Sequence, residues 1–476
     1  LSTPVNEQYN CKNLSDRGVG YGIESLTVDG NNVIEVYSKI KEIRKKIIKK
    51  PQPFLIEFKT FRMRGHEEAS GVKYVPKELL EKWGKKDPVL NFEAFLIDSS
   101  ILTVEDVTKI KKGITKEIDT NLEKTFNEKK IISSVENELS DVYADFNFKK
   151  VEKSNEVQNM RLVDSISDGL KEAMYKNDSL IIMGQDIAEY GGVFKITEGF
   201  VDLFGKDRVR NTPICESSII EIAMGLSICN RKSIVELQFS DFITSGFNPV
   251  VNYLAKSHYR WGQNADIVLR MPCGAGVGAG PFHSQTNEAW FTKTPGLIVV
   301  YPSTPIDAKG LLISSIENPN PVLFFEHKAL YRSIRDDVPK GYYNIEIGKA
   351  KLLNVDTDIT IITYGSGVHE SIETIKKHSL SADLIDLRTL SPLDNDSIIQ
   401  SVRKTGKAII LQEDSLFGGL ASEISSIIME NCFENLDAPV IRVGSLDTPI
   451  PFEETLEKQY LPFERFESEI LKLIDY

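Results

Sequence analysis

A carboxylate, Glu216, stands where a turn enters an apolar helix. Pro213 ends the preceding segment, the two serines after Glu216 can cap unpaired amides, and residues 219–224 give the helix a buried face. A charged group at the edge of an apolar core is tolerated when it has a partner or a function, such as sharing a proton with a ligand. A charge that stabilises the helix dipole is the second interpretation.

Two arginines and a histidine follow a short apolar run, residues 54–58, which predicts a buried strand. Ligands of open α/β sheets lie beyond the carboxyl ends of strands. Arg62 and Arg64 can hold a phosphate there, and His66 can donate a hydrogen bond or transfer a proton. A solvated basic loop is the alternative.

The segment 273–286 is rich in glycine and ends in polar side chains. Its glycines alternate with other residues and do not match the dinucleotide fingerprint, which opens a helix after a strand. They allow a close approach of the backbone to a ligand or a movement of the loop. Since the chain has 6 histidines, His283 on such a loop is a candidate functional residue.

The composition favours an acidic protein of a reducing compartment. A net charge of −12 over 476 residues provides no field that attracts nucleic acid or an anionic membrane. The 5 cysteines have no metal-like spacing, and their odd count argues against a disulfide framework. No apolar run has the length of a membrane span. We therefore predict a cytoplasmic protein with neither nucleic acid nor membrane as a partner.

Alternating strands and helices predict an α/β protein of several domains. After residue 160 the pattern is that of a doubly wound parallel sheet, and a smaller sheet of the same kind, with no obvious catalytic constellation, follows from 345. We predict an N-terminal part (1–130) with a charged helical appendage, a linker (131–157) and two further domains (158–340 and 345–476).

The chain after about residue 160 resembles the β subunit of the thiamine diphosphate-dependent 2-oxoacid dehydrogenases, the decarboxylating component of those complexes. The similar motifs occur in the order of the family and are residues 183–188, 212–216, 282–285, 294–297, 325–332 and 386–393. Residues 1–130 resemble the C-terminal half of the α subunit, with 61–66 in place of its active-site loop. The resemblance implies a fused α/β chain with a transketolase-like, thiamine diphosphate-binding α/β fold of doubly wound parallel sheets.

The resemblance also implies roles for six residues. Glu216 matches the glutamate that hydrogen-bonds the aminopyrimidine ring of the cofactor, and Phe242 and Ile214 belong to the site of the same ring. His283 matches a histidine that assists the substrate or acyl transfer. His66 matches a histidine near the cofactor diphosphate, and Arg62 lies beside it.

The activity that the resemblance implies is oxidative decarboxylation of a 2-oxoacid, followed by transfer of the acyl group to a lipoyl arm. Residues 324–332 and 446–452 favour a branched-chain substrate such as 2-oxoisovalerate, with pyruvate next. The expected partners are a second copy of the fused chain, in a homodimer, and the lipoyl-bearing acyltransferase core. Transketolase-type ketol transfer and a non-catalytic scaffold are the alternatives.

Two departures from the family pattern concern the metal and regulation. The family binds diphosphate through Mg²⁺, and the segment that supplies the metal ligands is expected upstream of Leu1. We therefore assign no metal ligand in this chain and expect it to be part of a longer polypeptide. Glu67 follows the histidine where mitochondrial relatives have a phosphorylated serine, and Ser70 is out of register.

Overall fold

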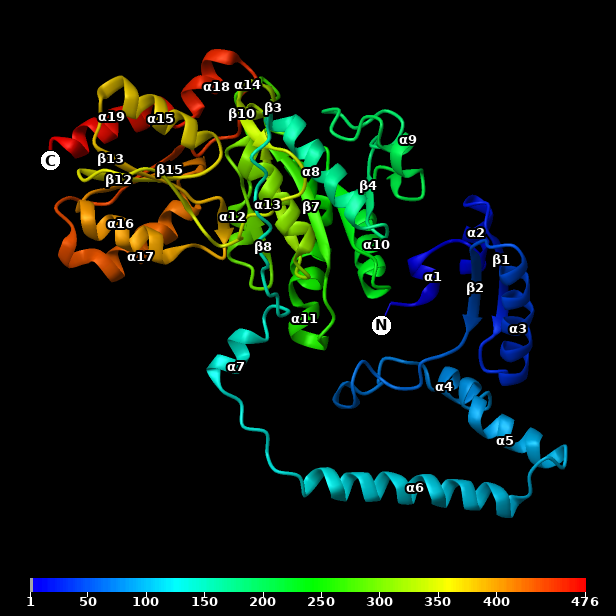
Figure 1. Ribbon diagram of the computed structural model, residues 1–476. Helices are drawn as coiled ribbons and strands as arrows, with labels where there is room; N and C mark the ends of the chain where they lie inside the picture. Colours follow the sequence, from blue (N-terminus) through cyan, green and yellow to red (C-terminus); the bar gives the residue numbers. More distant parts are fainter. Residues whose placement is uncertain (1–2) are drawn as a thin grey trace. The chain divides into compact units, whose positions relative to one another are not determined.

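The computed structural model describes residues 3–476, the side chain of Glu68 excepted, and divides into two compact units, Leu1–Ile132 and Ser133–Tyr476 (Figure 1). In the first unit, β1 (Glu24–Asp29) and β2 (Phe54–Lys59) pair in parallel, and α3 (Val33–Lys49) connects them. The second strand lies where the apolar run 54–58 predicts it. The remaining elements are α1 (Val5–Gln8), η1 (Leu14–Asp16), α2 (Arg17–Gly20), η2 (Glu68–Ser70), α4 (Lys77–Gly84), α5 (Pro88–Asp98) and α6 (Val104–Phe126).

The charged helices of the first unit begin at side-chain caps. Asp87 accepts hydrogen bonds from the amides of Val89 and Leu90 at the start of α5. Thr103 and Asp106 form a reciprocal capping box at the start of α6. Because caps satisfy amides that have no partner within the helix, they fix where these helices begin.

The second unit contains a seven-stranded sheet of order β14-β8-β9-β7-β6-β4-β5. All neighbouring strands in it are parallel except β14 and β8. The strands are β4 (Ile181–Gly184), β5 (Val209–Asn211), β6 (Ser233–Glu236), β7 (Ile267–Cys273), β8 (Ile298–Val300), β9 (Val322–His327) and β14 (Thr389–Ser391). The sheet is thus a doubly wound α/β sheet, as the alternation of strands and helices predicts.

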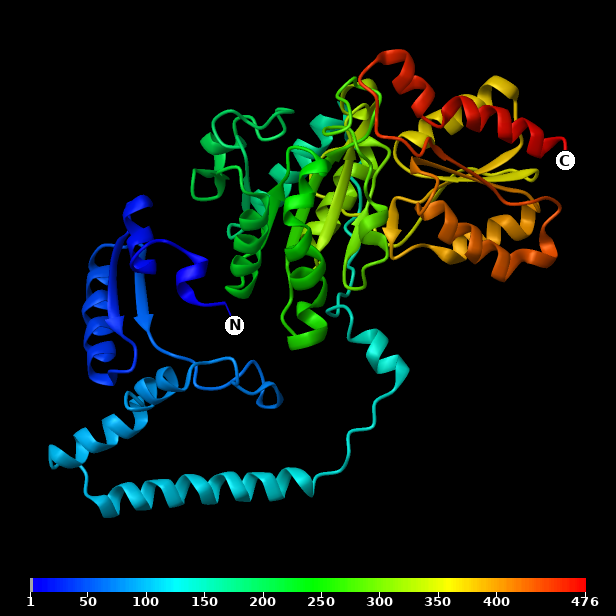
Figure 2. The ribbon, with the colours of Figure 1, turned by 180° about the vertical axis from the view of Figure 1, so that it is seen from behind.

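Helices cover both faces of this sheet (Figures 1 and 2). Successive residues of β7 show why: Val268 packs into the core under α8 (Leu162–Lys176) and α13 (Pro305–Glu317), and Leu269 into the opposite core. The opposite core includes residues of α10 (Glu216–Ile228), η4 (Pro249–Leu254) and α11 (Ala255–Trp261). In this core the wider π turns of η4 lead directly into α11.

A second sheet, of order β11-β13-β12-β15-β16, lies in the C-terminal part of the same unit. In Figure 1, α15 and α19 cover one face, and α16 and α17 cover the other. These elements are β11 (Lys351–Asn354), β12 (Ile359–Thr363), α15 (Ser366–His378), β13 (Ala382–Asp386), α16 (Asn395–Thr405), β15 (Ala408–Ser415), α17 (Leu420–Cys432), η5 (Phe433–Asn435), β16 (Ile441–Ser445), α18 (Glu454–Tyr460) and α19 (Phe463–Ile474).

The two sheets of the second unit are not independent. One apolar core contains Leu269 and Phe325 of the first sheet together with Ile362 and Ile410 of the second. In addition, β14 follows β13 in the chain but adds an antiparallel edge strand to the larger sheet. The smaller sheet is therefore held against the larger one by a shared core and by main-chain hydrogen bonds.

The second half of the predicted linker is attached to the second unit. Asn320 exchanges side-chain hydrogen bonds with the amide and the carbonyl of Ala144, at 2.8 and 3.0 Å. Asn344 accepts from the amide of Val151 and donates to the carbonyl of Lys149. The flanking elements are α7 (Val135–Ser140) and the ribbon of β3 (Val157–Arg161) with β10 (Arg335–Pro339).

Buried charges join three neighbouring strands of the larger sheet. Arg270 on β7 donates two hydrogen bonds to Glu326 on β9, at 2.7 and 2.8 Å, and a third to Glu236 on β6. All three side chains are buried, and Tyr331 on α14 (Leu330–Ser333) also donates to Glu326. Burial disfavours the guanidinium charge, but the two carboxylates outweigh it and raise the pKa of Arg270.

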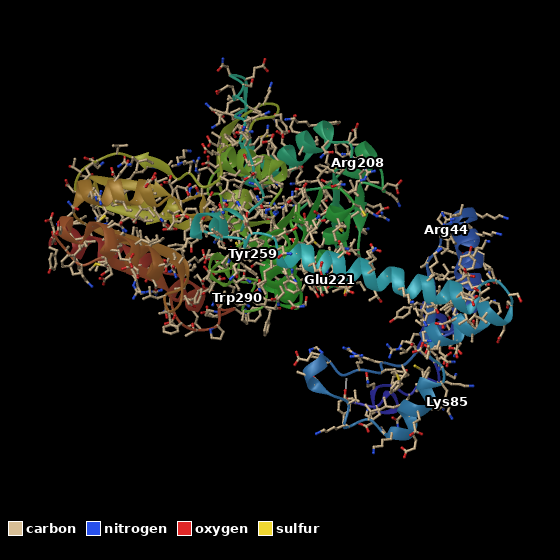
Figure 3. All side chains as sticks on the ribbon, turned by 90° about the horizontal axis from the view of Figure 1, so that it is seen from below. Arg44, Lys85, Arg208, Glu221, Tyr259 and Trp290 are labelled. Carbon is tan, nitrogen blue, oxygen red and sulfur yellow. The ribbon has the colours of Figure 1, made fainter. Side chains whose placement is uncertain are left out.

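At the far edge of the sheet, Arg208 (labelled in Figure 3) holds the chain between α9 (Phe200–Phe204) and β5. It donates to the main-chain carbonyls of Met174, Asn177 and Leu180. Carbonyls at the C-terminus of α8 therefore gain a cationic partner, which the helix dipole favours.

We predict that Arg270→Met lowers the free energy of unfolding by about 3–5 kcal/mol, because it leaves Glu236 and Glu326 buried without a counter-ion. Urea unfolding followed by circular dichroism measures the change. Arg442→Met, at an exposed arginine of β16, is the matched control. A loss no larger than that of the control would show that the triad does not stabilise the sheet.

Candidate active site

The side chain of Glu216, the first residue of α10, is half-buried and oriented by two donors. Gln185 Nε2 donates to its Oε1 at 3.0 Å, and Ser245 Oγ donates to its Oε2 at 3.2 Å. Glu216 also lies in the first turn of α10, where the helix dipole favours a negative charge. The helix-dipole interpretation therefore holds as well, but it does not account for the two side-chain donors.

An aromatic cluster that includes His283 lies next to this carboxylate. The His283 ring meets the rings of Phe239 and Phe242 edge-on, with centroids 4.8 and 5.6 Å apart. Ser245, which donates to Glu216, also donates to the carbonyl of Phe242 within η3 (Ser240–Gly246). The structure thus brings together three of the residues singled out in the sequence: Glu216, Phe242 and His283.

The parallel order of the sheet explains this convergence. Gln185 follows β4, η3 follows β6, and the glycine-rich segment that ends in His283 follows β7. These three strands are neighbours, so their carboxyl ends lie along one edge of the sheet, where ligands of open α/β sheets bind. The sequence alone assigns no role to Gln185 or Ser245. The position of Gln185, directly after an apolar strand, could nevertheless have identified it as a candidate.

Apolar surface flanks the start of α10. Ile214, two residues before Glu216, is 84% exposed. A cavity of about 560 Å³ beside α10 has a largely apolar lining that includes Met183, Pro213 and Ile219. An exposed isoleucine next to an oriented carboxylate and an aromatic ring suits a flat heteroaromatic ligand with a polar edge.

Arg62 and His66 lie together in the first unit. Arg62 Nη2 donates to the carbonyl of His66 at 2.9 Å, and both residues are exposed. A Cβ added at Gly65 would lie 2.5 Å from the carbonyl oxygen of Gly71, so the loop folds back on itself here. The structure therefore presents a histidine and an arginine on one closed loop.

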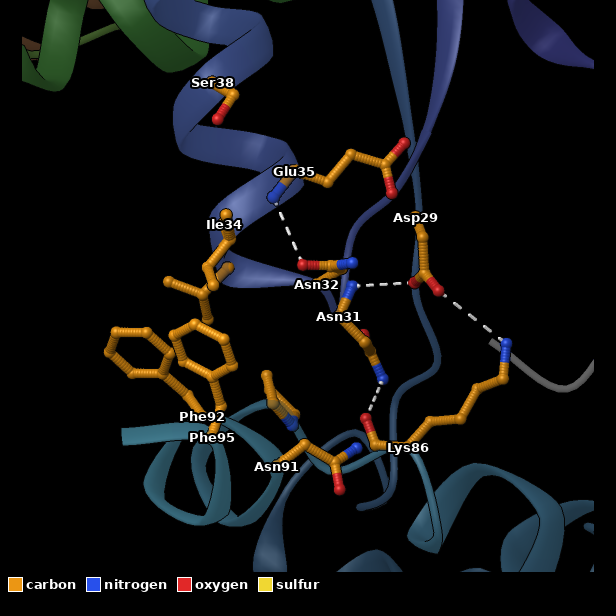
Figure 4. A pocket seen from close by; sticks show the side chains of 12 residues that line it. Asp29, Asn31, Asn32, Ile34, Glu35, Ser38, Lys86, Asn91, Phe92 and Phe95 are labelled. Carbon is orange, nitrogen blue, oxygen red and sulfur yellow. Dashed lines mark hydrogen bonds and ion pairs between the residues drawn. The ribbon is translucent and has the colours of Figure 1, made fainter. Parts of the chain in front are cut away.

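A cavity of about 650 Å³ in the same unit is a different feature (Figure 4). Asn32 accepts from the amide of Glu35, Asn31 Nδ2 donates to the carbonyl of Lys86, and Asp29 accepts from the amide of Asn31. These polar groups already have hydrogen-bond partners within the protein, so they are not left to bind a ligand. We therefore do not choose this cavity as the candidate active site.

The described residues contain no group of three or more histidine, cysteine, aspartate or glutamate side chains that could hold a metal ion. The side chains around Glu216 and His283 fit an aminopyrimidine ring, which needs a carboxylate and an aromatic surface, but they do not fit Mg²⁺. Within residues 3–476, moreover, no helix has the length and apolarity needed to cross a membrane.

Two largely buried acids lie where the two sheets of the second unit meet: Glu288 comes from the part with the larger sheet, and Asp414 on β15 comes from the C-terminal part, in which the sequence shows no obvious catalytic constellation. Glu288, just before α12 (Ala289–Thr292), accepts from Tyr364 at 2.6 Å. Burial and the nearby carboxylate of Asp414 raise the pKa of Glu288 to about 8. Burial and Glu413 likewise raise the pKa of Asp414 to about 7.

Three family models match the chain. "Transketolase, pyrimidine binding domain" matches residues 158–333, "Transketolase, C-terminal domain" matches 348–465, and "Dehydrogenase E1 component" matches 1–133. Among solved structures, the chain resembles "Split gene transketolase, inactive beta4 tetramer" with a TM-score of 0.53 and 20% identity, over 66% of this chain and 98% of that one. This last likeness shows the fold.

Curated relatives are closer in sequence. The mitochondrial 2-oxoisovalerate dehydrogenase subunit beta of Dictyostelium discoideum is 43% identical over 328 residues, 67% of this chain and 88% of the relative. From Bacillus subtilis, the 2-oxoisovalerate dehydrogenase subunit beta is 42% identical (63% of this chain, 94% of the relative). The pyruvate dehydrogenase E1 component subunit beta of the same organism is 41% identical (64% and 94%).

The fold and these domains define a transketolase-like enzyme of the thiamine diphosphate-dependent class. The chain belongs to the E1 component family of the 2-oxoacid dehydrogenases, and it joins an α-type part and a β-type part in one polypeptide. The E1 components of these complexes work with a lipoyl-bearing acyltransferase core.

The buried acids predict a pH dependence of stability. The folded protein binds protons at Glu288 and Asp414 more tightly than the unfolded chain does, in which the pKa values of these carboxyls are near 4.5 and 3.8. The stability that this tighter binding contributes is therefore fully present below those unfolded-state pKa values, and it is lost as the pH rises through about 7 to 8. Between about pH 6 and about pH 9 the Tm of the wild type should therefore decrease, and the Tm of Glu288→Gln should decrease by less.

Thermal unfolding at several pH values measures this difference. Glu454→Gln on α18 removes an exposed acid and is the control. Parallel curves for wild type and Glu288→Gln over this pH range would contradict the prediction.

Proposed function

We propose that the chain catalyses the thiamine diphosphate-dependent oxidative decarboxylation of a 2-oxoacid and passes the acyl group to a lipoyl domain. The observation that carries the proposal is the carboxylate of Glu216, oriented by Gln185 and Ser245 beside the rings of Phe242 and His283. A non-catalytic scaffold needs neither an oriented carboxylate nor a histidine at this edge of the sheet.

Thiamine diphosphate, when bound, supplies a nucleophilic carbon and an electron sink for decarboxylation. Glu216 would hold the aminopyrimidine ring by sharing a proton with a ring nitrogen. Gln185 and Ser245 keep both carboxylate oxygens in place, so little reorganisation accompanies the proton transfer. Phe242 and Ile214 would present apolar surface to the same ring.

His283 would assist at the reacting end of the cofactor. Its ring is half-buried and held edge-on by two phenylalanines, so the imidazole nitrogens have a restricted orientation. Such an imidazole can donate or accept a proton while the acyl group passes to one sulfur of the lipoyl disulfide, whose S–S bond breaks and whose second sulfur leaves as a thiol, so that the disulfide is the oxidant. Arg62 and His66 would bind the diphosphate by charge and hydrogen bonding.

We infer that the substrate is a branched-chain 2-oxoacid such as 2-oxoisovalerate, with pyruvate as the next candidate. Two of the curated relatives are named for 2-oxoisovalerate, but a pyruvate dehydrogenase subunit has nearly the same identity. Residues 324–332 include most of β9 and Glu326 of the buried Arg270 triad, so the sequence likeness there concerns the core. The segment 446–452 gives the better support, because Phe452 packs against Gly280, three residues before His283.

We further propose a homodimer of fused chains that binds a lipoyl-bearing acyltransferase core in the cytoplasm. The family works with such a core, and all five cysteines of the chain are free, as a reducing compartment requires.

Replacing Glu216 with glutamine should lower 2-oxoacid decarboxylation by about 10²- to 10⁴-fold, because an amide cannot take up and return the proton. Release of carbon dioxide from 2-oxoisovalerate, with thiamine diphosphate, Mg²⁺ and a lipoyl domain present, measures the rate. Glu221→Gln, on the exposed face of the same helix (Figure 3), should keep the wild-type rate. Activity of Glu216→Gln within a few-fold of the wild type would refute the assignment.

The ratio of kcat/KM values for 2-oxoisovalerate and pyruvate tests the substrate. We expect the branched substrate to be favoured by about 10-fold or more, since each additional buried methylene group contributes on the order of 1 kcal/mol. A preference for pyruvate would overturn the branched-chain inference. Turnover of a sugar phosphate without a lipoyl domain would instead indicate a transketolase-type reaction.

A further inference from the structure

The loop that carries His283 is held from the C-terminal part of the chain. We call residues 273–283 the glycine loop. It leaves the end of β7 and passes through four glycines with positive φ, a conformation that L side chains rarely adopt: Gly274, Gly276, Gly278 and Gly280. A chain that turns in this way directs several amide groups outward and forms a concave binding site for an anion.

Two carboxylates accept hydrogen bonds from amides of the glycine loop. Glu413 on β15 accepts from the amide of Ala275 at 2.7 Å. Glu457 on α18 accepts from Gly276 at 2.9 Å and, through its other oxygen, from Gly278 at 3.0 Å. Glu413 and Glu457 are 7% and 5% exposed, so the carboxylates that accept these charge-assisted hydrogen bonds are buried.

Ring contacts hold the two ends of the same turn. A Cβ added at Gly274 would lie 2.3 Å from Nε2 of His327, which itself bonds to Glu413 at 2.6 Å. A Cβ added at Gly280 would lie 2.4 Å from the ring of Phe452. The glycine loop is thus held by ring contacts at both ends, the second of them three residues before His283.

We propose that Glu457 is a positioning residue for the reaction: by binding the amides of Gly276 and Gly278, it keeps His283 against Phe239 and Phe242. Glu457 touches no reacting group and acts through the glycine loop. The inference rests on the proposed function in one respect, the catalytic use of His283. It extends that function by giving the smaller sheet and α18 a part in the chemistry.

Glu413 is less suitable for the test. It also accepts from Ser366 at 2.6 Å and bonds to His327, so its removal would disturb several buried groups at once. The hydrogen bonds of Glu457 to the glycine loop make it the more specific position for substitution.

The test compares Glu457→Gln and Glu457→Asp with Glu454→Gln. The amide of glutamine has one acceptor oxygen in place of two and carries no charge. Gly278 then loses its 3.0 Å hydrogen bond to the second oxygen and keeps only the longer one, at 3.3 Å, to the oxygen that Gly276 also uses. Glu457→Asp keeps the charge on a shorter side chain and should restore part of the effect. Glu454 is on the same helix, exposed and paired with Lys458, and serves as the matched control.

Hydrogen exchange and turnover are both measured on the whole chain. In Glu457→Gln, we expect the amides of the glycine loop to exchange about 10-fold faster, as the loss of one charge-assisted hydrogen bond implies. We expect kcat for 2-oxoacid decarboxylation to fall by about 10- to 100-fold, because small misplacement of a catalytic group is costly, with KM nearly unchanged. Glu454→Gln should match the wild type in each respect.

Unchanged exchange in the glycine loop of Glu457→Gln, or faster exchange with an unchanged kcat, would overturn the proposal. If Glu457→Gln does not fold, Glu457→Asp supplies the same two measurements. The NMR signal of the His283 ring, shifted by the ring currents of its phenylalanine neighbours, gives a readout without turnover. If the wild type decarboxylates no 2-oxoacid, the proposed function fails, whereas an unmoved His283 signal in Glu457→Gln refutes the positioning role by itself.

Discussion

The buried ion triad of Arg270, Glu236 and Glu326 is the interaction on which the candidate site depends. It joins β6, β7 and β9, and the segments that carry Phe242 and His283 begin within a few residues of its ends. Because a buried guanidinium cannot be left unpaired without a large free-energy cost, the three strands are fixed relative to one another. The loops that follow them consequently begin from fixed positions, although the loops themselves are irregular.

The C-terminal part of the chain completes this arrangement. It adds β14 to the larger sheet, shares an apolar core with it and supplies two carboxylates to the glycine loop. In a fold built from successive α/β domains, such contacts give a domain without reacting groups an influence on the geometry of the site. The acids Glu288 and Asp414 lie where the two sheets meet, and burial raises their pKa values to about 8 and about 7.

The sequence predicts the α/β class and most strands and helices, because apolar runs that alternate with amphipathic helices admit few other folds. It also points to Glu216 and His283, whose local settings are unusual by themselves. It does not reveal Ser245, because this donor meets Glu216 only through the tertiary fold. Nor does it reveal the partners of the glycine loop, since Glu413 and Glu457 follow their amides by 138 and 181 residues. The edge strand β14 is missed for the same reason.

A crystal structure of the protein with thiamine diphosphate bound would show whether Glu216 holds the aminopyrimidine ring. We expect this ring against Phe242, with a carboxylate oxygen of Glu216 about 2.7–3.2 Å from a ring nitrogen. We also expect His283 on the side of the reacting carbon. A ring bound elsewhere, or a Glu216 that keeps its bonds to Gln185 and Ser245 and makes none to the cofactor, would contradict this assignment.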